Sequence, residues 1–132
     1  MTEPEIGATH ALRGTVDEGR TAQSLAQTGE QLPPVFGTPF MIADMERACA
    51  ALLAPHLAPG KVSVGARIEV SHLAPTALGE TVTATARFQG RAGPLYWFEV
   101  WAEDGNGRIG EGRIARAVVD QVALLAKARA RN

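Results

Sequence analysis

The sequence predicts an α+β domain in which one long central helix packs against a single curved antiparallel sheet. Two patterns support this prediction: one helical pattern over residues 39–54, and strand patterns separated by turns over residues 61–119. A helix and a sheet each present one apolar face, and packing these faces together buries both. We therefore expect one domain over residues 10–132, preceded by a flexible tail over residues 1–9.

The central helix has clear start and stop signals. Thr38 belongs to the residue types that cap helices, and Pro39 is favoured at the first helical position. Pro55 ends the helix. Apolar side chains share one stripe at helical spacing: Met41, Met45, Ala48, Cys49 and Leu52. Because Ile42 and Leu53 widen this stripe, we expect protein around most of the helix, with Asp44 on the solvent side.

The segment that follows the helix has the alternation of a half-buried strand. The expected helix-facing side carries apolar residues at alternate positions and ends in a histidine: Val64, Ile68, Val70 and His72. Ser63 and Gly65 then fall on the opposite face. His72 is therefore a polar side chain on an apolar face.

The remaining elements complete the sheet. We expect a first strand over residues 11–16 and then a lid-like loop over residues 17–37, since glycine and proline interrupt any regular pattern there. Glycine-containing turns between the later strands predict hairpins, so residues 61–119 are expected to form a four-strand meander. A short helix is expected over residues 120–131.

The second face and the edge of this sheet would need cover, which favours oligomers. Trp97 and Trp101 share one strand face with Glu99 and Glu103. We interpret the two tryptophans as packing residues, with a subunit contact as one place for them.

Composition and charge exclude several classes of protein. The chain has 132 residues and a formal net charge of -1, so it lacks the basic surface that a nucleic-acid partner requires. Its single cysteine cannot form an internal disulfide. The three histidines show no metal-ligand spacing, so no metal site is expected. The longest apolar run and the acidic N-terminus predict no membrane partner and no signal peptide, hence a cytoplasmic protein.

Three polar residues each allow a structural and a functional interpretation. His72 is either a hydrogen-bonded core histidine or a proton shuttle that titrates near neutrality. Glu46, at the margin of the apolar stripe, is either a boundary residue or a partly desolvated base. Thr38 is either a helix cap or a group beside the N–H donors of the helix start, which suit an oxyanion. Taken singly, each residue fits the structural interpretation better.

Three stretches of the sequence together resemble the fluoroacetyl-CoA-type thioesterases, whose fold is the hotdog fold, a sheet wrapped around one long helix. The stretches are VFGTPFMIADMERACAALLAPHLAPG, ARIEVSHLAPT preceded by Gly65, and IGEGRIARAVV. The resemblance implies that Thr38, Glu46 and His72 form a catalytic set. It further implies that Gly65 and Arg116 lie at the acyl site.

The same resemblance implies an acyl-CoA substrate, no separate cofactor because coenzyme A is part of that substrate, and a homodimer or a dimer of dimers. Phe36 belongs to the matching motif and is expected to contact substrate. In the lid-like segment, where the relatives carry phenylalanines, this chain offers only Leu25 and Leu32, and these two leucines are expected to contact substrate.

The candidate residues and the resemblance together give three candidate functions. The first is an acyl-CoA thioesterase that hydrolyses a small acyl thioester to a carboxylic acid and free coenzyme A. The alternative is a non-catalytic hotdog module that binds acyl-CoA or a small hydrophobic ligand. An enoyl hydratase ranks last, because the sequence lacks the local Asp-His pattern of those enzymes. Release of a free thiol identifies the thioesterase. Saturable ligand binding without thiol release identifies the binding module, and loss of enoyl absorbance without thiol release identifies the hydratase.

Overall fold

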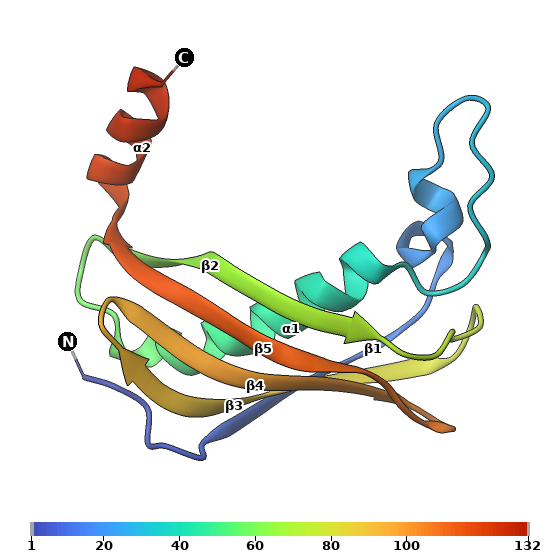
Figure 1. Ribbon diagram of the computed structural model, residues 1–132, viewed down its shortest axis with the longest axis horizontal. Helices are drawn as coiled ribbons and strands as arrows, with labels where there is room; N and C mark the ends of the chain where they lie inside the picture. The colour runs from blue at the N-terminus through green and yellow to red at the C-terminus, as the bar shows by residue number, and fades with distance from the viewer. Residues whose placement is uncertain (1, 132) are drawn as a thin grey trace.

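In the computed structural model, which describes residues 2–131, one five-stranded antiparallel sheet curves around the helix α1 (Thr38–Leu53) (Figure 1). The strands are β1 (Thr9–Thr15), β2 (Lys61–His72), β3 (Thr81–Ala92), β4 (Leu95–Asp104) and β5 (Gly107–Asp120). A second helix, α2 (Gln121–Ala130), follows β5 and projects away from the sheet. The predicted α+β architecture is confirmed.

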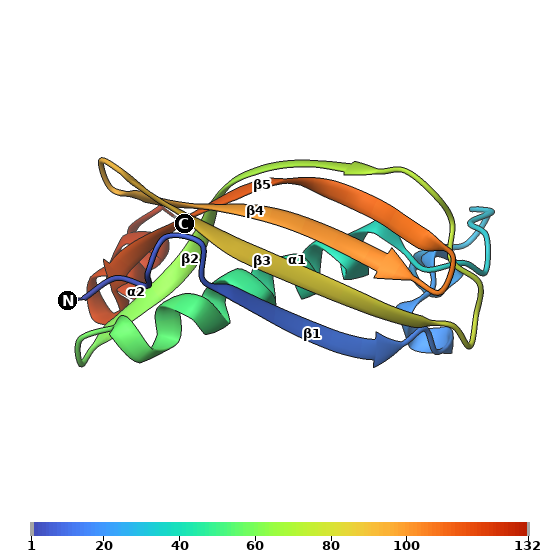
Figure 2. The same cartoon turned by 90° about the horizontal axis from the view of Figure 1, so that it is seen from below.

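The order of strands across the sheet is β1-β3-β4-β5-β2. Tight turns at residues 93–94 and 105–106 force β3, β4 and β5 to lie side by side as hairpins. The longer connection over residues 73–80 places no such constraint on β2, which pairs with β5 at the far edge (Figure 2). The prediction that all four strands form a meander is therefore wrong for β2.

The start of α1 differs from the expected cap. Gly37, in an extended conformation, occupies the N-cap position, and Thr38 is the first helical residue. A side chain at Gly37 would have its Cβ 2.9 Å from the Phe40 ring and 3.1 Å from the backbone nitrogen of Ala22, so this close approach requires glycine. The Thr38 hydroxyl is thus free to bond elsewhere. At its other end, α1 continues into a single 3-10 turn, η3 (Ala54–His56).

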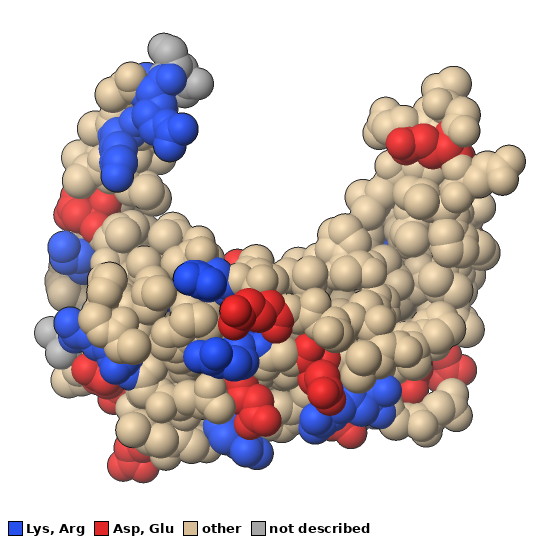
Figure 3. Space-filling model, viewed as in Figure 1, with Lys and Arg blue, Asp and Glu red and all other residues tan. Residues whose placement is uncertain are grey.

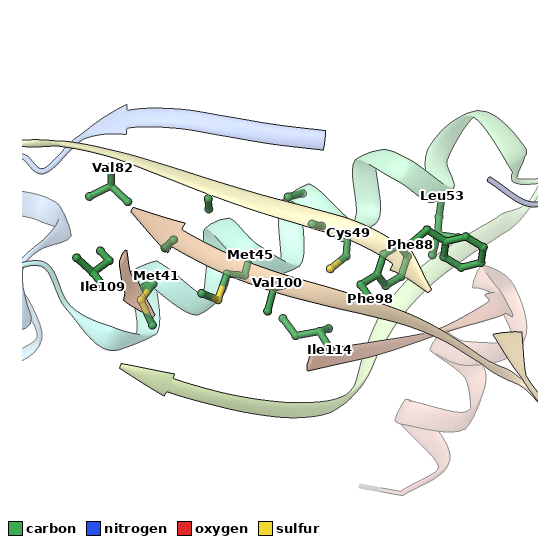
Figure 4. Close-up of a cluster of buried hydrophobic side chains, with 14 of the residues drawn as sticks. Met41, Met45, Cys49, Leu53, Val82, Phe88, Phe98, Val100, Ile109 and Ile114 are labelled. Carbon is green, nitrogen blue, oxygen red and sulfur yellow. The ribbon is translucent and has the colours of Figure 1, made fainter. Parts of the chain in front are cut away.

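The core fills the space between α1 and the concave face of the sheet (Figure 4). Ten of its fully buried side chains are Met41, Met45, Cys49, Leu53, Val82, Phe88, Phe98, Val100, Ile109 and Ile114. The predicted apolar stripe of the helix is confirmed, except that Leu53 is buried where Leu52 is only half-buried. Burial of each large side chain stabilises the fold by about 2 kcal/mol.

A β-bulge interrupts β2. Gly65 pairs with Arg116 and Arg67 pairs with Ala115, so Ala66 is an extra residue in the strand. One extra residue exchanges the two faces of a strand along the rest of its length. The predicted grouping of Val64 with Ile68, Val70 and His72 is therefore wrong, and Ser63 and Gly65 lie on the helix side instead.

The segment over residues 17–37 folds back on itself beside the start of α1. It contains two short 3-10 helices, η1 (Glu18–Arg20) and η2 (Ala22–Leu25). The nitrogen of Ala22 donates to the carbonyl of Val35 at 2.8 Å, which closes the base of the segment. The Arg20 side chain forms an ion pair with Asp44 of α1. Asp44 is therefore largely buried rather than on the solvent side, because the segment covers it.

The described part of the predicted tail runs beside β3. Gly7 donates to the carbonyl of Phe88 at 2.8 Å, and Phe88 donates to the carbonyl of Ala8 at 2.9 Å. Thr2 Oγ1 lies 2.6 Å from His56 Nδ1. These contacts hold residues 2–8 against the domain, and the flexibility of the tail stays a prediction.

The outer face of the sheet carries alternating charges around the two tryptophans. The Arg113 guanidinium lies 4.1 Å from the centre of the Trp97 ring, and that of Arg87 lies 5.0 Å from Trp101. Figure 3 shows basic and acidic side chains interspersed over this face. Cations of the same chain therefore cover both rings, and a subunit contact at the tryptophans stays a prediction.

Candidate active site

The N-terminal end of α1 meets the C-terminal end of β2 at a threonine–histidine pair. Thr38 Oγ1 lies 2.7 Å from His72 Nδ1, which is a hydrogen bond. Thr38 makes this bond because Gly37 holds the cap position. The structural interpretation of Thr38 as a cap is therefore wrong, and the hydroxyl of the first helical residue faces an imidazole.

The environment of His72 favours its neutral form. Its Nε2 is buried and has no hydrogen-bond partner within residues 2–131. Burial lowers the pKa of His72 from the ordinary 6.5, and the backbone of Ala74 offsets part of this effect. A neutral imidazole accepts a proton at one nitrogen and carries one at the other, so the Thr38 hydroxyl can donate to Nδ1.

The threonine–histidine pair lies on the wall of a pocket of about 330 Å³. The lining residues are mostly apolar: Ala22, Pro33, Val35, Phe36, Thr38, His72, Leu73, Ala74 and Pro75. The structure thus places the buried Phe36 at the pocket, and its contact with substrate stays a prediction. Leu25 and Leu32 are absent from this lining and are 41% and 39% exposed, so the structure does not bring these two predicted residues to the pocket.

A second polar group lies further along α1, where Glu46 forms an ion pair. Arg116 Nη1 donates to Glu46 Oε2 at 3.0 Å, and the Arg116 side chain is only 10% exposed. Arg116 also donates from Nε to Ser63 Oγ at 3.0 Å and from Nη2 to the Ser63 carbonyl at 2.9 Å. The guanidinium is therefore held on one side by β2 and presented on the other to a carboxylate.

Gly65 lies directly against this carboxylate. A Cβ at Gly65 would be 2.5 Å from Glu46 Oε2, so only glycine leaves room for the carboxylate there. The bulge in β2 brings Gly65 to this face, although strict alternation predicts the opposite one. The structure thus brings together Gly65, Arg116 and Glu46.

The two polar groups are separate within one chain. Thr38 and Glu46 are eight positions apart on α1, which corresponds to about 12 Å along the helix axis. Glu46 is absent from the pocket lining, and its ion-pair partner is Arg116. Sequence reasoning found all three candidate catalytic residues but did not predict this separation. It also missed Ser63, because alternation without the bulge places Ser63 on the wrong face.

Residues 2–131 contain no candidate metal site, no helix that could span a membrane and no reactive cysteine. No three His, Cys, Asp or Glu side chains within residues 2–131 gather as metal ligands would. None of the helices in that range has the length and apolar character that crossing a membrane demands. Burial raises the pKa of the Cys49 thiol to about 12, so this core cysteine stays protonated.

Comparison with solved structures gives the class of the protein. A Thermus thermophilus protein described as a thioesterase superfamily member matches with a TM-score of 0.89 and 25% identity, covering 98% of this chain and 93% of that one. A hot-dog-like protein from Thermanaerovibrio acidaminovorans matches with a TM-score of 0.85 and 27% identity, covering 96% and 92%. A fluoroacetyl-CoA thioesterase matches with a TM-score of 0.92 and 34% identity, covering 99% of both chains. The chain is a thioester hydrolase with the hotdog fold.

Sequence comparison gives the family. Residues 16–122 match the family described as fluoroacetyl-CoA-specific thioesterase. The fluoroacetyl-CoA thioesterase of Streptantibioticus cattleyicolor is 42% identical over 99 residues, which span 75% of this chain and 71% of that protein. The chain belongs to this family, and the resemblance seen in its three sequence stretches is confirmed.

Proposed function

We propose that the pocket beside Thr38 and His72 binds the acyl group of a small acyl-CoA, whose thioester is hydrolysed there to a carboxylic acid and free coenzyme A. The observation that carries this proposal is the 2.7 Å bond between the Thr38 hydroxyl and His72 Nδ1 at the wall of the pocket. Acyl transfer requires a proton acceptor beside the reacting oxygen and a donor for the carbonyl oxygen.

His72 and Thr38 have complementary roles in this proposal. The Thr38 hydroxyl positions the reacting group. The Thr38 N–H at the start of α1 polarises the thioester carbonyl, since Pro39 has no N–H and the next two N–H groups of the helix donate to the Gly37 carbonyl. His72 orients the attacking water or supplies a proton to the departing thiolate. Its lowered pKa keeps the imidazole able to accept a proton at neutral pH.

The Glu46 carboxylate takes part in hydrolysis by one of two routes, as a base or as a nucleophile. In the first, it takes a proton from water, the hydroxide adds to the carbonyl carbon, and the C–S bond breaks to release the thiolate. In the second, the carboxylate itself attacks, expels the thiolate and forms an anhydride that water then hydrolyses. Mass spectrometry of a slow variant separates them, since an acyl group trapped on Glu46 or Thr38 supports a covalent route and its absence in a single turnover supports direct attack by water.

We infer that Glu46 acts on the pocket of a partner subunit in a homodimer. The separation of about 12 Å along α1 supports this inference, as does the position of β2 at the sheet edge, where Ile68 is 46% exposed. Figure 3 shows a hollow bounded by α2 and the segment over residues 17–37. A second copy paired along β2 by a two-fold axis would fill it. With this axis at the midpoint of β2, the partner's carboxylate would lie nearer the His72 end, because Gly65 precedes that midpoint.

The acyl group is proposed to be short, with acetyl-CoA and fluoroacetyl-CoA among the substrates. The pocket volume of about 330 Å³ and its apolar wall support a short chain. Because the substrate is a coenzyme A thioester, we propose that the enzyme acts in the cytoplasm.

Free-thiol release from a panel of acyl-CoAs tests the proposal. The panel runs from acetyl and fluoroacetyl to medium-chain and aryl groups. We expect fast turnover of the short members, and a loss of at least about 100-fold in the Glu46→Gln variant. Saturable binding of acyl-CoA by folded protein, with no thiol released from any member, would instead support the non-catalytic binding module.

A further inference from the structure

We propose that Ser63 is a positioning residue for the Glu46 carboxylate, acting through Arg116. The inference rests on the proposed role of Glu46 and adds a residue that neither the sequence patterns nor the resemblance indicates. Ser63 lies on β2, Arg116 on β5 and Glu46 on α1, so the contact joins three elements.

The geometry fixes the guanidinium on one side. Ser63 accepts two hydrogen bonds from Arg116, one at its hydroxyl from Nε at 3.0 Å and one at its carbonyl from Nη2 at 2.9 Å. Two such bonds set the plane of the guanidinium, whose donors have a rigid arrangement. Nη1 is then directed at Glu46 Oε2, 3.0 Å away.

The position of Glu46 depends on this guanidinium. Within residues 2–131, Arg116 is the hydrogen-bond and ion-pair partner that the carboxylate has. Oε2 lies against the backbone of Gly65, where a Cβ would be only 2.5 Å away, so no side chain at this position of β2 holds the carboxylate. If the Ser63 hydroxyl is removed, Arg116 keeps only its backbone anchor and Glu46 loses a fixed partner.

The bulge in β2 explains why a serine can have this role. Without the extra residue at Ala66, the alternation of the sequence would point Ser63 away from α1. With it, Ser63 and Gly65 share the helix side of an edge strand. The same irregularity therefore supplies both the anchor for Arg116 and the open space for Glu46.

Two substitutions of matched shape test the inference. Ser63→Thr retains a hydroxyl acceptor, and Ser63→Val has the shape of threonine without it. In thiol-release assays we expect Ser63→Val to lower kcat about tenfold with little change in KM, and Ser63→Thr to stay within about twofold of the parent protein. Equal activity of the two variants would overturn the proposal.

A double-mutant cycle separates positioning from a merely structural effect. If Ser63 acts through Glu46, then Ser63→Val should cost less than about twofold when Glu46 is already glutamine. An equal loss in both backgrounds would overturn the proposal. Near-parental activity of Glu46→Gln alone would contradict the role proposed for Glu46, which is a distinct result.

A crystal structure of the Ser63→Val variant gives a readout that does not depend on turnover. We expect the Arg116 guanidinium to rotate and its contact with Glu46 to lengthen or break. An unchanged 3.0 Å contact would overturn the proposal even if the protein proved to hydrolyse nothing.

Discussion

The Thr38 hydroxyl is available for chemistry because its neighbour takes over the cap position of the helix. Gly37 occupies the N-cap without a side-chain bond, and Thr38 bonds to His72 instead. A threonine at this position contributes little to the stability of the helix, since β-branched side chains are only moderate helix formers. Its bond to a histidine at the edge of a pocket supports the catalytic role proposed for this residue.

Replacement of Thr38 by valine should reduce kcat/KM by about 100-fold or more, because valine has the same shape but no hydroxyl to bond His72. Thr38→Ser keeps the hydroxyl and serves as the matched control, with activity within about tenfold of the parent. Thiol release measures both variants. Equal rates for valine and threonine would show that the hydroxyl takes no part.

The lowered pKa of His72 predicts how activity depends on pH. Where His72 accepts the Thr38 hydroxyl bond it must be neutral, so the limb that His72 contributes to the kcat/KM profile should lie below pH 6.5, the ordinary pKa of histidine. His72→Gln should lose this limb together with most of the activity. A limb centred at or above pH 6.5 in the parent protein would contradict the assignment.

The same shift predicts how stability depends on pH. Because the pKa of His72 is lower in the folded chain than its unfolded value near 6.5, the unfolded chain takes up the proton first as the pH falls. The stabilisation is therefore present above pH 6.5 and decreases as the pH falls from there toward the folded pKa. Thermal unfolding of the parent and of His72→Gln measures this, and the variant should show a smaller decrease across that window.

At the scale of elements, the bulge in β2 connects the strand to the carboxylate on α1. Patterns of apolar residues predicted the helix and its buried stripe, and glycine-containing turns predicted the hairpins between β3, β4 and β5, because these features depend on local sequence. The place of β2 beside β5 and the extra residue at Ala66 depend on contacts between distant segments. The sequence therefore singled out Thr38, Glu46 and His72 as candidates but missed Ser63.

Gly65→Ala tests the contact between the bulged strand and α1. The added Cβ would lie 2.5 Å from Glu46 Oε2, and a flexible carboxylate can move aside at small cost to the fold. We expect kcat to fall at least about tenfold while the melting temperature changes by only a few degrees. Gly19→Ala is the control, since its Cβ would make only an ordinary 3.5 Å contact with Asp17. Unchanged activity of Gly65→Ala would show that the placement of this carboxylate is not critical.

At the scale of the whole molecule, two projections frame the β2 edge of the sheet. α2 has no buried residues and carries Lys127 and Arg129 in its last turn, while the segment over residues 17–37 rises at the opposite end (Figures 1 and 3). Unpaired strand edges invite pairing with another chain. A homodimer along β2 would cover this edge and combine the two polar groups that one chain holds apart.

The central claim is that Thr38 and His72 of one subunit act on the same thioester as Glu46 of the other subunit. Mixed dimers of two inactive variants test this claim most directly. Thr38→Val and Glu46→Gln are each expected to be nearly inactive alone, whereas a mixed dimer would contain one intact site of two. Random exchange makes about half of the dimers mixed, so thiol release should recover to about a quarter of the parent rate. Recovery to that level supports the shared site, whereas activity no greater than the sum of the two variants, in a mixture shown to contain mixed dimers, would contradict it.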